Sequence, residues 1–222
     1  MSLLETVQLR HNRISLALHQ VRAGTGRALL LLHGLGEDAE SMSKLEVQWT
    51  GPVWALDFTG HGRSSVPRGG GYSAEILMAD VDIALRHLGE VTIVGRGLGG
   101  YVGFLIAGAR PHLVKGVVII DGPGLSGGAI HATSSSEIAS AGPRAGMAPD
   151  PWALVELSRD ARPPNYAVTF TRLAVNGSDL DEPVAVATRV APPWIEAISA
   201  EPGVMTNISL EEALATYAGH HD

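Results

Sequence analysis

The sequence contains no cysteine among its 222 residues. A disulfide, a thiol nucleophile and a zinc or iron–sulfur site built on cysteine are therefore excluded. Lysine is scarce as well, because only Lys44 and Lys115 are lysines and the other basic residues are arginines. Together with the many glycines and alanines, this preference for arginine indicates a GC-rich bacterial genome.

The sequence also lacks a long hydrophobic run. No stretch approaches the ~18 consecutive apolar residues of a membrane span, and the first residues, MSLLETVQLRHNR, contain no hydrophobic block of a secretory signal. Acidic residues outnumber basic ones by 23 to 16, and the resulting net charge of −7 would repel a nucleic-acid backbone. We therefore expect a cytoplasmic protein whose partners include neither a membrane nor a nucleic acid.

The composition that remains is that of a globular protein, with 45% hydrophobic and 18% charged residues. A chain of this length can bury one large core, so we expect a single domain over residues 1–222. Its oligomeric state is not encoded in any pattern that we recognise.

Short β-rich runs alternate with helical patterns along the chain. The expected strands lie at residues 7–10, 13–22, 28–32, 52–56, 91–94, 116–120 and 172–175, with a weaker candidate at 194–199. The expected helices lie at 73–88, 98–109, 182–190 and 210–218. Because parallel strands are joined by crossovers that cover the sheet, this order predicts an α/β fold with a mostly parallel sheet and helices on both faces. Residues 122–165, rich in Gly, Ser, Ala and Pro, interrupt the pattern, and we expect a reduced lid or a mobile loop there.

Three glycine-rich turns follow expected strands. They are His33-Gly34-Leu35-Gly36, Asp57 followed by Gly60-His61-Gly62-Arg63-Ser64, and Gly95-Arg96-Gly97-Leu98-Gly99-Gly100. In this order they resemble the α/β-hydrolase superfamily, with its HG loop, its D-x-x-G-x-G-x-S turn and its nucleophile elbow G-x-S-x-G. The resemblance implies a sheet of about seven to eight strands, a short lid, and an oxyanion hole made by the backbone N–H groups of Leu35 and Leu98.

Two positions depart from the pattern of this superfamily. Gly97 stands where the elbow nucleophile is expected, so no side chain can attack a substrate there. In relatives the general base follows the last strand in a Gly-His pair, and the counterpart here is Gly203-Val204, which puts Val204 at the histidine position. His220 and His221 are expected to form a solvated tail. The chain is thus interpreted as a divergent member that lacks both the nucleophile and the catalytic histidine.

The carboxylate of the catalytic triad has a counterpart in the sequence. By the resemblance, Asp179 or Asp181 holds the acid position, after the strand expected at 172–175. The alternative is that either aspartate is the N-cap of the helix expected next. Without a histidine to orient, this carboxylate has no known task.

Backbone donors survive the loss of side chains, and Leu98 also opens a helix whose positive end favours a carbonyl or carboxylate oxygen. The predicted ligand site consists of Gly34, Leu35, Arg96, Gly97, Leu98 and Val204. We therefore expect a protein without conventional serine-hydrolase activity that binds a small carbonyl-containing molecule. It would act as a non-hydrolytic catalyst of the cyclase or lyase type, or as a pseudoenzyme or receptor, and the sequence leaves open whether any reaction is catalysed.

Three alternatives stay open. An active ester, lactone or amide hydrolase could use a displaced site, for which the candidates are His33, His61 or His131 with Ser64, Ser126 or the serines of 134–136. The pattern Gly95-x-Gly97-x-x-Gly100 also matches a dinucleotide-binding fingerprint, with Asp121 as its ribose-binding acid. A purely structural protein would have a pocket filled by its own side chains. We expect no cofactor, and no metal because no His, Asp and Glu residues cluster in the sequence.

Overall fold

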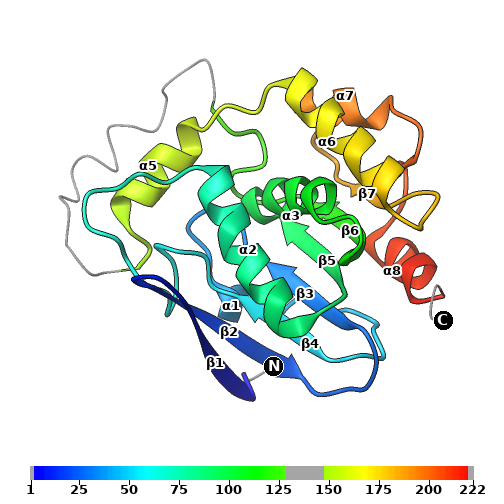
Figure 1. Ribbon diagram of the computed structural model, residues 1–222. Helices are drawn as coiled ribbons and strands as arrows, with labels where there is room; N and C mark the ends of the chain where they lie inside the picture. Colours follow the sequence, from blue (N-terminus) through cyan, green and yellow to red (C-terminus); the bar gives the residue numbers. More distant parts are fainter. Residues whose placement is uncertain (1–2, 129–147, 220–222) are drawn as a thin grey trace.

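The structure, a computed structural model, describes residues 3–128 and 148–219 and is built around an eight-stranded sheet (Figure 1). The strands are β1 (Glu5–His11), β2 (Ile14–Arg22), β3 (Ala28–Leu32), β4 (Val53–Leu56), β5 (Val91–Arg96), β6 (Val114–Ile120), β7 (Val184–Ala187) and β8 (Val204–Met205). Their order is β1-β2-β4-β3-β5-β6-β7-β8. The β1–β2 and β2–β4 pairs are antiparallel, and every pair from β4 to β8 is parallel.

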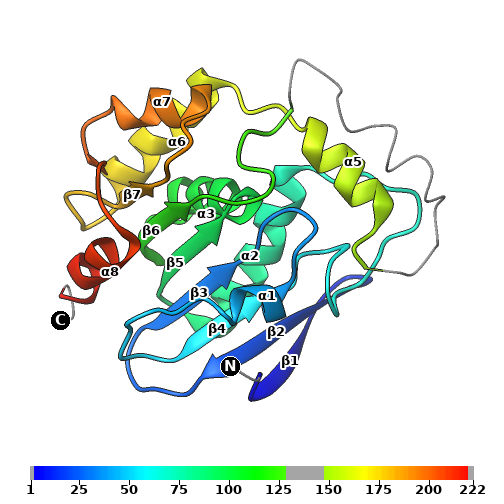
Figure 2. The same ribbon diagram turned by 180° about the vertical axis from the view of Figure 1, so that it is seen from behind.

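Helices cover both faces of the sheet, which confirms the expected α/β fold. They are α1 (Ala39–Met42), α2 (Ala74–Leu88), α3 (Leu98–Ala109), α5 (Pro151–Arg159), α6 (Pro164–Gly177), α7 (Pro193–Ser199) and α8 (Leu210–Ala218). One face packs against α2, α3, α6 and α7, and the other packs against α1 and α8 (Figure 2). In β3 the side chains alternate accordingly, since Leu30 and Leu32 contact the first core and Leu29 and Leu31 the second. None of the helices in the described ranges has the length and apolar character that crossing a bilayer requires.

For three segments, the predicted secondary structure was wrong: two expected strands are helical, and one expected helix contains a strand. Residues 172–175 belong to α6, whose buried residues Ala167, Thr171 and Ala174 recur at helical spacing. Residues 182–190 contain β7 instead of a helix, because its four apolar residues are inserted between β6 and β8. The weak strand candidate at 194–199 lies in α7, where Trp194, Ile195 and Ile198 form the buried side of a short helix.

The expected lid region, residues 122–165, contains one helix, α5, and a segment, 129–147, that lies outside the described residues. Helix α5 begins at Asp150, whose side chain accepts a hydrogen bond from the Trp152 N–H, and Pro151 occupies its first turn. In Figures 1 and 2 this helix lies beside the N-terminal end of α2, away from α6 and α7.

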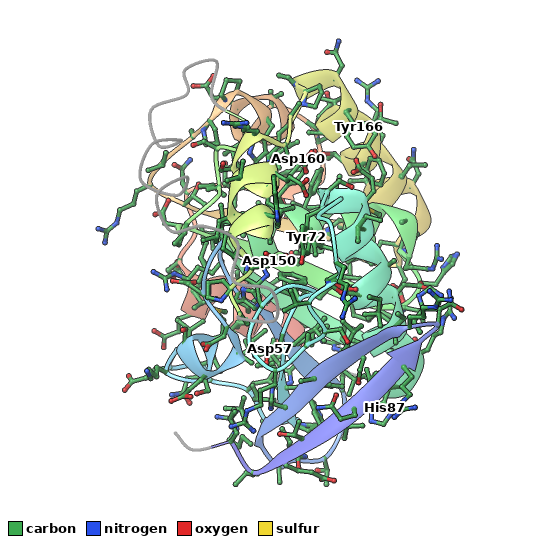
Figure 3. The ribbon with its side chains drawn as sticks, turned by 90° about the vertical axis from the view of Figure 1, so that its left-hand side faces the viewer. Asp57, Tyr72, His87, Asp150, Asp160 and Tyr166 are labelled. Atoms are coloured by element: carbon green, nitrogen blue, oxygen red, sulfur yellow. The ribbon has the colours of Figure 1, made fainter. Side chains whose placement is uncertain are left out.

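Three carboxylates attach α5 to the loop that precedes α2 (Figure 3). Asp150 accepts from the Tyr72 hydroxyl at 2.7 Å, and Asp160 accepts from the Ala74 N–H at 2.8 Å. Glu156 accepts from both the Gly71 and the Tyr72 N–H groups at 2.7 Å. Burial raises the pKa of the Asp160 carboxyl. The position of α5 therefore depends on acceptors supplied by acidic side chains.

Replacing Glu156 tests this attachment. Glu156→Ala leaves two backbone N–H groups without their carboxylate, and we expect the free energy of unfolding to fall by about 1–2 kcal/mol. Hydrogen exchange should become faster in residues 69–74 and in α5 itself. Glu211→Ala, at an exposed position in the first turn of α8, is the control and should change neither quantity. Unchanged exchange at 69–74 in Glu156→Ala would contradict the proposed attachment.

Candidate functional site

The turn between β5 and α3 has the geometry of a nucleophile elbow without a nucleophile. Gly97 adopts φ 57° and ψ −115°, which is the left-handed region that favours glycine. Its N–H donates to the Ile120 carbonyl at 3.0 Å, and Leu98 begins α3 immediately after it. The predicted elbow is therefore present in the backbone, and Gly97 supplies no reactive atom.

The loop that follows β6 crosses directly over Gly97. A Cβ atom added at Gly97 would lie 2.1 Å from the Pro123 carbonyl oxygen and 2.5 Å from the Gly122 carbonyl carbon. Both contacts are with backbone and are far shorter than any real Cβ contact. The absence of a side chain at Gly97 is therefore required by the path of the loop, and a serine there would have no room.

The predicted oxyanion-hole donors are both in use. The N–H groups of Leu35 and Leu98 donate to one oxygen, the carbonyl of Pro123, at 3.0 Å and 2.9 Å. These distances are those expected between such donors and a bound oxyanion or carbonyl oxygen. The two donors thus point at one position, and the oxygen that occupies it belongs to the protein itself.

Anchors on both sides hold this loop in place. Before Pro123, the Asp121 carboxylate accepts from the N–H groups of Arg189 and Val190, at 2.8 Å and 3.2 Å. After it, the Trp194 indole N–H donates to the Leu125 carbonyl at 2.9 Å. We call residues 121–128 the plug loop, because their backbone fills the space above the elbow.

The remaining residues of the predicted ligand site have partners within the chain. The Arg96 guanidinium pairs with Glu37 at 2.6 Å and donates to the Asp121 carbonyl. The other oxygen of Glu37 accepts from the Gly34 N–H at 3.0 Å. Arg96 and Gly34 therefore fix the HG turn against β5 instead of facing a ligand.

The first turn of α3 offers no free donors to a dinucleotide. Its leading N–H groups bind carbonyls of the chain: Leu98 binds Pro123, Gly99 binds His33, and Gly100 and Tyr101 bind Gly97. Asp121, the residue that would hold the ribose, caps Arg189 and Val190 instead. This arrangement leaves neither the pyrophosphate nor the ribose a binding group on the fingerprint.

The buried histidines of the glycine turns are structural. His33 Nε2 accepts from the Phe58 N–H at 3.1 Å, so the ring is neutral and its Nδ1–H donates to the Gly34 carbonyl. Burial lowers the pKa of His33 to about 4, and it also lowers the pKa of His61. His61 is held in the same way, between the Gly36 N–H and the Thr59 carbonyl.

The predicted displaced site is not assembled from the residues that the structure describes. The Ser64 hydroxyl donates to the Asp57 carbonyl and accepts from the Ala17 N–H, so it is engaged by backbone groups and not by a histidine ring. His131 and the serines of 134–136 lie outside the described residues.

The acid prediction rested on a strand at 172–175, and that strand is part of a helix. Asp179 precedes β7 instead of following a strand, and it forms an exposed ion pair with Lys115 at 2.9 Å. Asp181 also precedes β7, and neither aspartate is an N-cap, because the helix expected after them is β7.

The histidine position falls in a strand as well. Val204 is the first residue of β8, where it pairs with Val184 and contributes to the core, so it lines no ligand site. The loop from β8 to α8 reads Thr206-Asn207-Ile208-Ser209 and contains no histidine. Placing the catalytic histidine in this loop, after β8, instead of at Val204 therefore does not supply a general base either.

The analysis of the sequence missed one buried pair, His19 and Asp57. His19 Nε2 lies 2.9 Å from the Asp57 carboxylate, which also accepts from the N–H groups of Ala39 and Arg63 at 2.7 Å. Burial opposes ionisation of Asp57, but these hydrogen bonds outweigh it and lower the pKa of the carboxyl. A histidine that directly follows the apolar residues 16–18 of β2 was the available signal.

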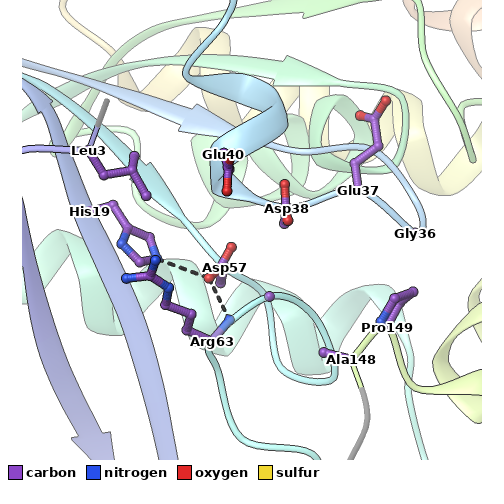
Figure 4. Close-up of a pocket in the computed structure, with 11 residues that line it drawn as sticks. Leu3, His19, Gly36, Glu37, Asp38, Glu40, Asp57, Arg63, Ala148 and Pro149 are labelled. Carbon is purple, nitrogen blue, oxygen red and sulfur yellow. Dashed lines mark hydrogen bonds and ion pairs between the residues drawn. The ribbon is translucent and has the colours of Figure 1, made fainter. Parts of the chain in front are cut away.

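His19 and Asp57 line a pocket of about 240 Å³ (Figure 4). Its other polar lining residues are Glu37, Asp38, Glu40 and Arg63. The Thr6 hydroxyl lies 2.8 Å from His19 Nδ1, which gives the order hydroxyl, imidazole, carboxylate of a hydrolytic triad. However, Thr6 is on β1, four strands away from β5, on the order of 19 Å from the elbow at the usual strand spacing. The oxyanion donors cannot serve this trio, and we interpret it as support for the turn after β4.

Asp57 should be essential for stability and sensitive to acid. Asp57→Asn removes a buried carboxylate that is hydrogen-bonded to His19, Ala39 and Arg63, and we expect a loss of about 3 kcal/mol in the free energy of unfolding at pH 7. Because the pKa of Asp57 is lowered in the folded state, its contribution is present above the ordinary value of 3.8 and is lost as the pH falls through the folded value. In denaturant unfolding, the difference in the free energy of unfolding between wild type and Asp57→Asn should therefore become smaller as the pH is lowered into the acid range.

Asp82→Asn is the matched control, because Asp82 pairs with the exposed side chains of Arg86 and Arg110 and should contribute under about 1 kcal/mol. If the difference in the free energy of unfolding between wild type and Asp57→Asn did not change with pH, Asp57 would not act through its ionised carboxylate.

Restoring a serine at the elbow should destabilise the protein without creating an esterase. Gly89 provides the comparison, since its φ 75° and ψ −135° resemble those of Gly97 but an added Cβ there meets no atom within 4 Å. Both Gly97→Ser and Gly89→Ser carry the conformational strain, and only Gly97→Ser collides with the plug loop. We expect Gly97→Ser to be less stable than Gly89→Ser by at least about 2 kcal/mol in thermal or denaturant unfolding. Equal stability of the two variants would show that the loop yields easily.

Comparisons with known proteins agree with this architecture. The family model described as "Alpha/beta hydrolase family" matches residues 29–218. The chain is 32% identical over 100 residues to "Esterase Rv0045c" of Mycobacterium tuberculosis, an alignment that covers 44% of this chain and 34% of that protein. It is 30% identical over 127 residues to the "(E)-2-((N-methylformamido)methylene)succinate hydrolase" of Acinetobacter baylyi, covering 53% of this chain and 45% of that protein.

The alignments thus span less than half the length of these two relatives. Among solved structures, the hypothetical protein PA1622 from Pseudomonas aeruginosa superposes with a TM-score of 0.64 at 18% identity, covering 97% of both chains, which supports the fold alone. The family match extends over most of the chain and includes the elbow, the HG turn and the strands that carry them. The chain therefore belongs to the α/β-hydrolase family.

Proposed function

We propose that this chain is a non-hydrolytic member of its family, a pseudoenzyme that binds a ligand and does not turn over esters or amides. The observation that carries the proposal is the Pro123 carbonyl oxygen, which accepts hydrogen bonds from both Leu35 and Leu98. A substrate carbonyl would need these two donors as its charge develops. In this chain they stabilise the plug loop.

Ester hydrolysis by this fold needs a nucleophile, a base and a free oxyanion hole in one place. The nucleophile position is Gly97, and a side chain there would collide with the plug loop. The buried histidines nearest in sequence to the glycine turns, His33 and His61, use both ring nitrogens for backbone partners. At the elbow, therefore, the described residues supply none of the three.

The position of the Pro123 carbonyl also favours one of the two non-hydrolytic functions that the sequence suggests, a receptor, over the other, a cyclase or lyase. A cyclase or lyase that relies on orientation and oxyanion stabilisation also needs the two donors to be free. A small carbonyl-containing molecule would reach them only by displacing Pro123, whose loop is anchored by Asp121 and by Trp194. We therefore favour a receptor or accessory role over catalysis, with the ligand held by groups other than the oxyanion hole.

Hydrolysis assays test the proposal directly. The purified chain should not hydrolyse p-nitrophenyl butyrate above the rate in buffer, and a fluorophosphonate probe should add no mass to the intact protein. The mycobacterial esterase that the chain resembles is a suitable positive control. Turnover at ordinary enzyme rates, about 1 s⁻¹ or more, would overturn the proposal. If turnover occurred and Thr6→Val abolished it, the chemistry would lie at the trio of Thr6, His19 and Asp57.

A further inference from the structure

Arg162, between α5 and α6, is a buried cation without a counter-ion. Its residue is only 7% exposed, and within 3–128 and 148–219 no carboxylate oxygen forms an ion pair with it. Burial lowers the pKa of the guanidinium to about 10, which still leaves it protonated at neutral pH. A buried charge of this kind is strongly unfavourable unless something pairs with it.

Two contacts fix the guanidinium and leave one of its edges without a hydrogen-bond partner among the described residues. Nη1 donates to the Leu125 carbonyl of the plug loop. The group lies over the Tyr101 ring, with its central carbon 4.5 Å from the ring centroid. Nε and Nη2 have no hydrogen-bond partner among the residues that the structure describes. These two nitrogens lie on the same edge of the planar group, and their N–H bonds are nearly parallel, as a bidentate partner requires.

The surroundings specify the kind of partner. The neighbouring carboxylate, Asp160, accepts from the Ala74 N–H and attracts Arg162 only at a distance. Because Asp160 is close enough to interact, a second negative charge would be tolerated better as a monoanion than as a dianion. Two aromatic rings lie beside the group: Tyr101, over which the guanidinium lies, and Trp194, whose indole N–H donates to the same Leu125 carbonyl as Nη1. Their centroids lie 5.0 Å apart. The site thus offers one positive charge, a two-pronged donor and an apolar aromatic wall.

We propose that Arg162 binds the carboxylate of a small organic acid, with the two oxygens accepting from Nε and Nη2 and an apolar body against Tyr101 and Trp194. This inference deepens the proposed binding function and rests on it. The bond from Nη1 to Leu125 is not needed by the ligand, so the plug loop can keep Pro123 in the oxyanion hole while the carboxylate is bound.

Entry to this edge requires a small movement of the plug loop near Gly127. A Cβ added at Gly127 would lie 2.8 Å from Cγ, Cδ and Nε of Arg162, so the backbone of the loop packs directly on the guanidinium stem. Gly127 adopts φ 69°, and the neighbouring Gly128 N–H donates to the Asp160 carbonyl at 2.7 Å. Both residues are glycines, so a shift of this part of the loop displaces no side chain of its own.

The test is a titration of the full ¹⁵N-labelled chain followed through the arginine Nε–Hε resonances. The probes are benzoate and butyrate, compared with the neutral benzamide and butyramide and with inorganic phosphate. We expect the Arg162 resonance, assigned by its loss in Arg162→Lys, to shift saturably with the carboxylates at about millimolar concentrations or below and not with the amides. Arg162→Gln should weaken carboxylate binding at least about tenfold, because it removes a charge-assisted bidentate contact. Arg159→Gln, at an exposed position of α5, is the matched control and should bind as the wild type does.

Failure of the carboxylate site and failure of the proposed non-hydrolytic function give different experimental results. If the carboxylates cause no saturable shift up to about 10 mM, or phosphate binds more tightly than they do, the carboxylate site is refuted. The absence of ester turnover would still support the pseudoenzyme. Should Arg162→Gln fail to fold, the comparison of benzoate with benzamide on the unaltered chain decides the question alone, because the two differ mainly in charge.

Discussion

The function proposed for this chain depends on two hydrogen bonds to one oxygen. The Leu35 and Leu98 N–H groups both donate to the Pro123 carbonyl, and the loop that supplies this carbonyl passes within contact of the Gly97 backbone. Each feature depends on the others, because the loop can take this path only over a residue without a side chain. Conversely, the donors at this turn would be unsatisfied and buried if the loop left without a replacement. The glycine at position 97 and the occupied N–H groups of Leu35 and Leu98 are therefore parts of one structural arrangement.

Much of the framework could be predicted from the sequence, and the reasons are physical. The parallel strands are apolar runs buried on both faces, and the three glycine turns follow the strands that were expected to carry them. Short segments near the C-terminus were misassigned, because four to six apolar residues fit a buried strand and one side of a helix equally well. This ambiguity moved the expected acid loop to Asp179, ahead of β7. It also moved the expected histidine loop to Val204, inside β8.

The contents of the site were harder to predict than its framework. The convergence of Leu35 and Leu98 followed from the resemblance, but no pattern indicated that Pro123 would lie between them, since a backbone carbonyl has no residue-type signature. Arg162 was equally hidden, because its burial over Tyr101 depends on the path of a loop about 35 residues earlier in the chain. Tertiary contacts of this kind place a carbonyl above Gly97, and at Arg162 they leave Nε and Nη2 without a hydrogen-bond partner among the described residues.

The occupied oxyanion hole can be observed without any ligand. Scalar couplings across hydrogen bonds, measured by NMR between the amide nitrogens of Leu35 and Leu98 and the carbonyl carbon of Pro123, report directly on whether both bonds exist in solution. The account predicts two resolvable couplings to this one carbon and strong protection of both amides from hydrogen exchange. Absent couplings together with rapid exchange at Leu35 and Leu98 would show that the hole is open, and the central claim would then be wrong.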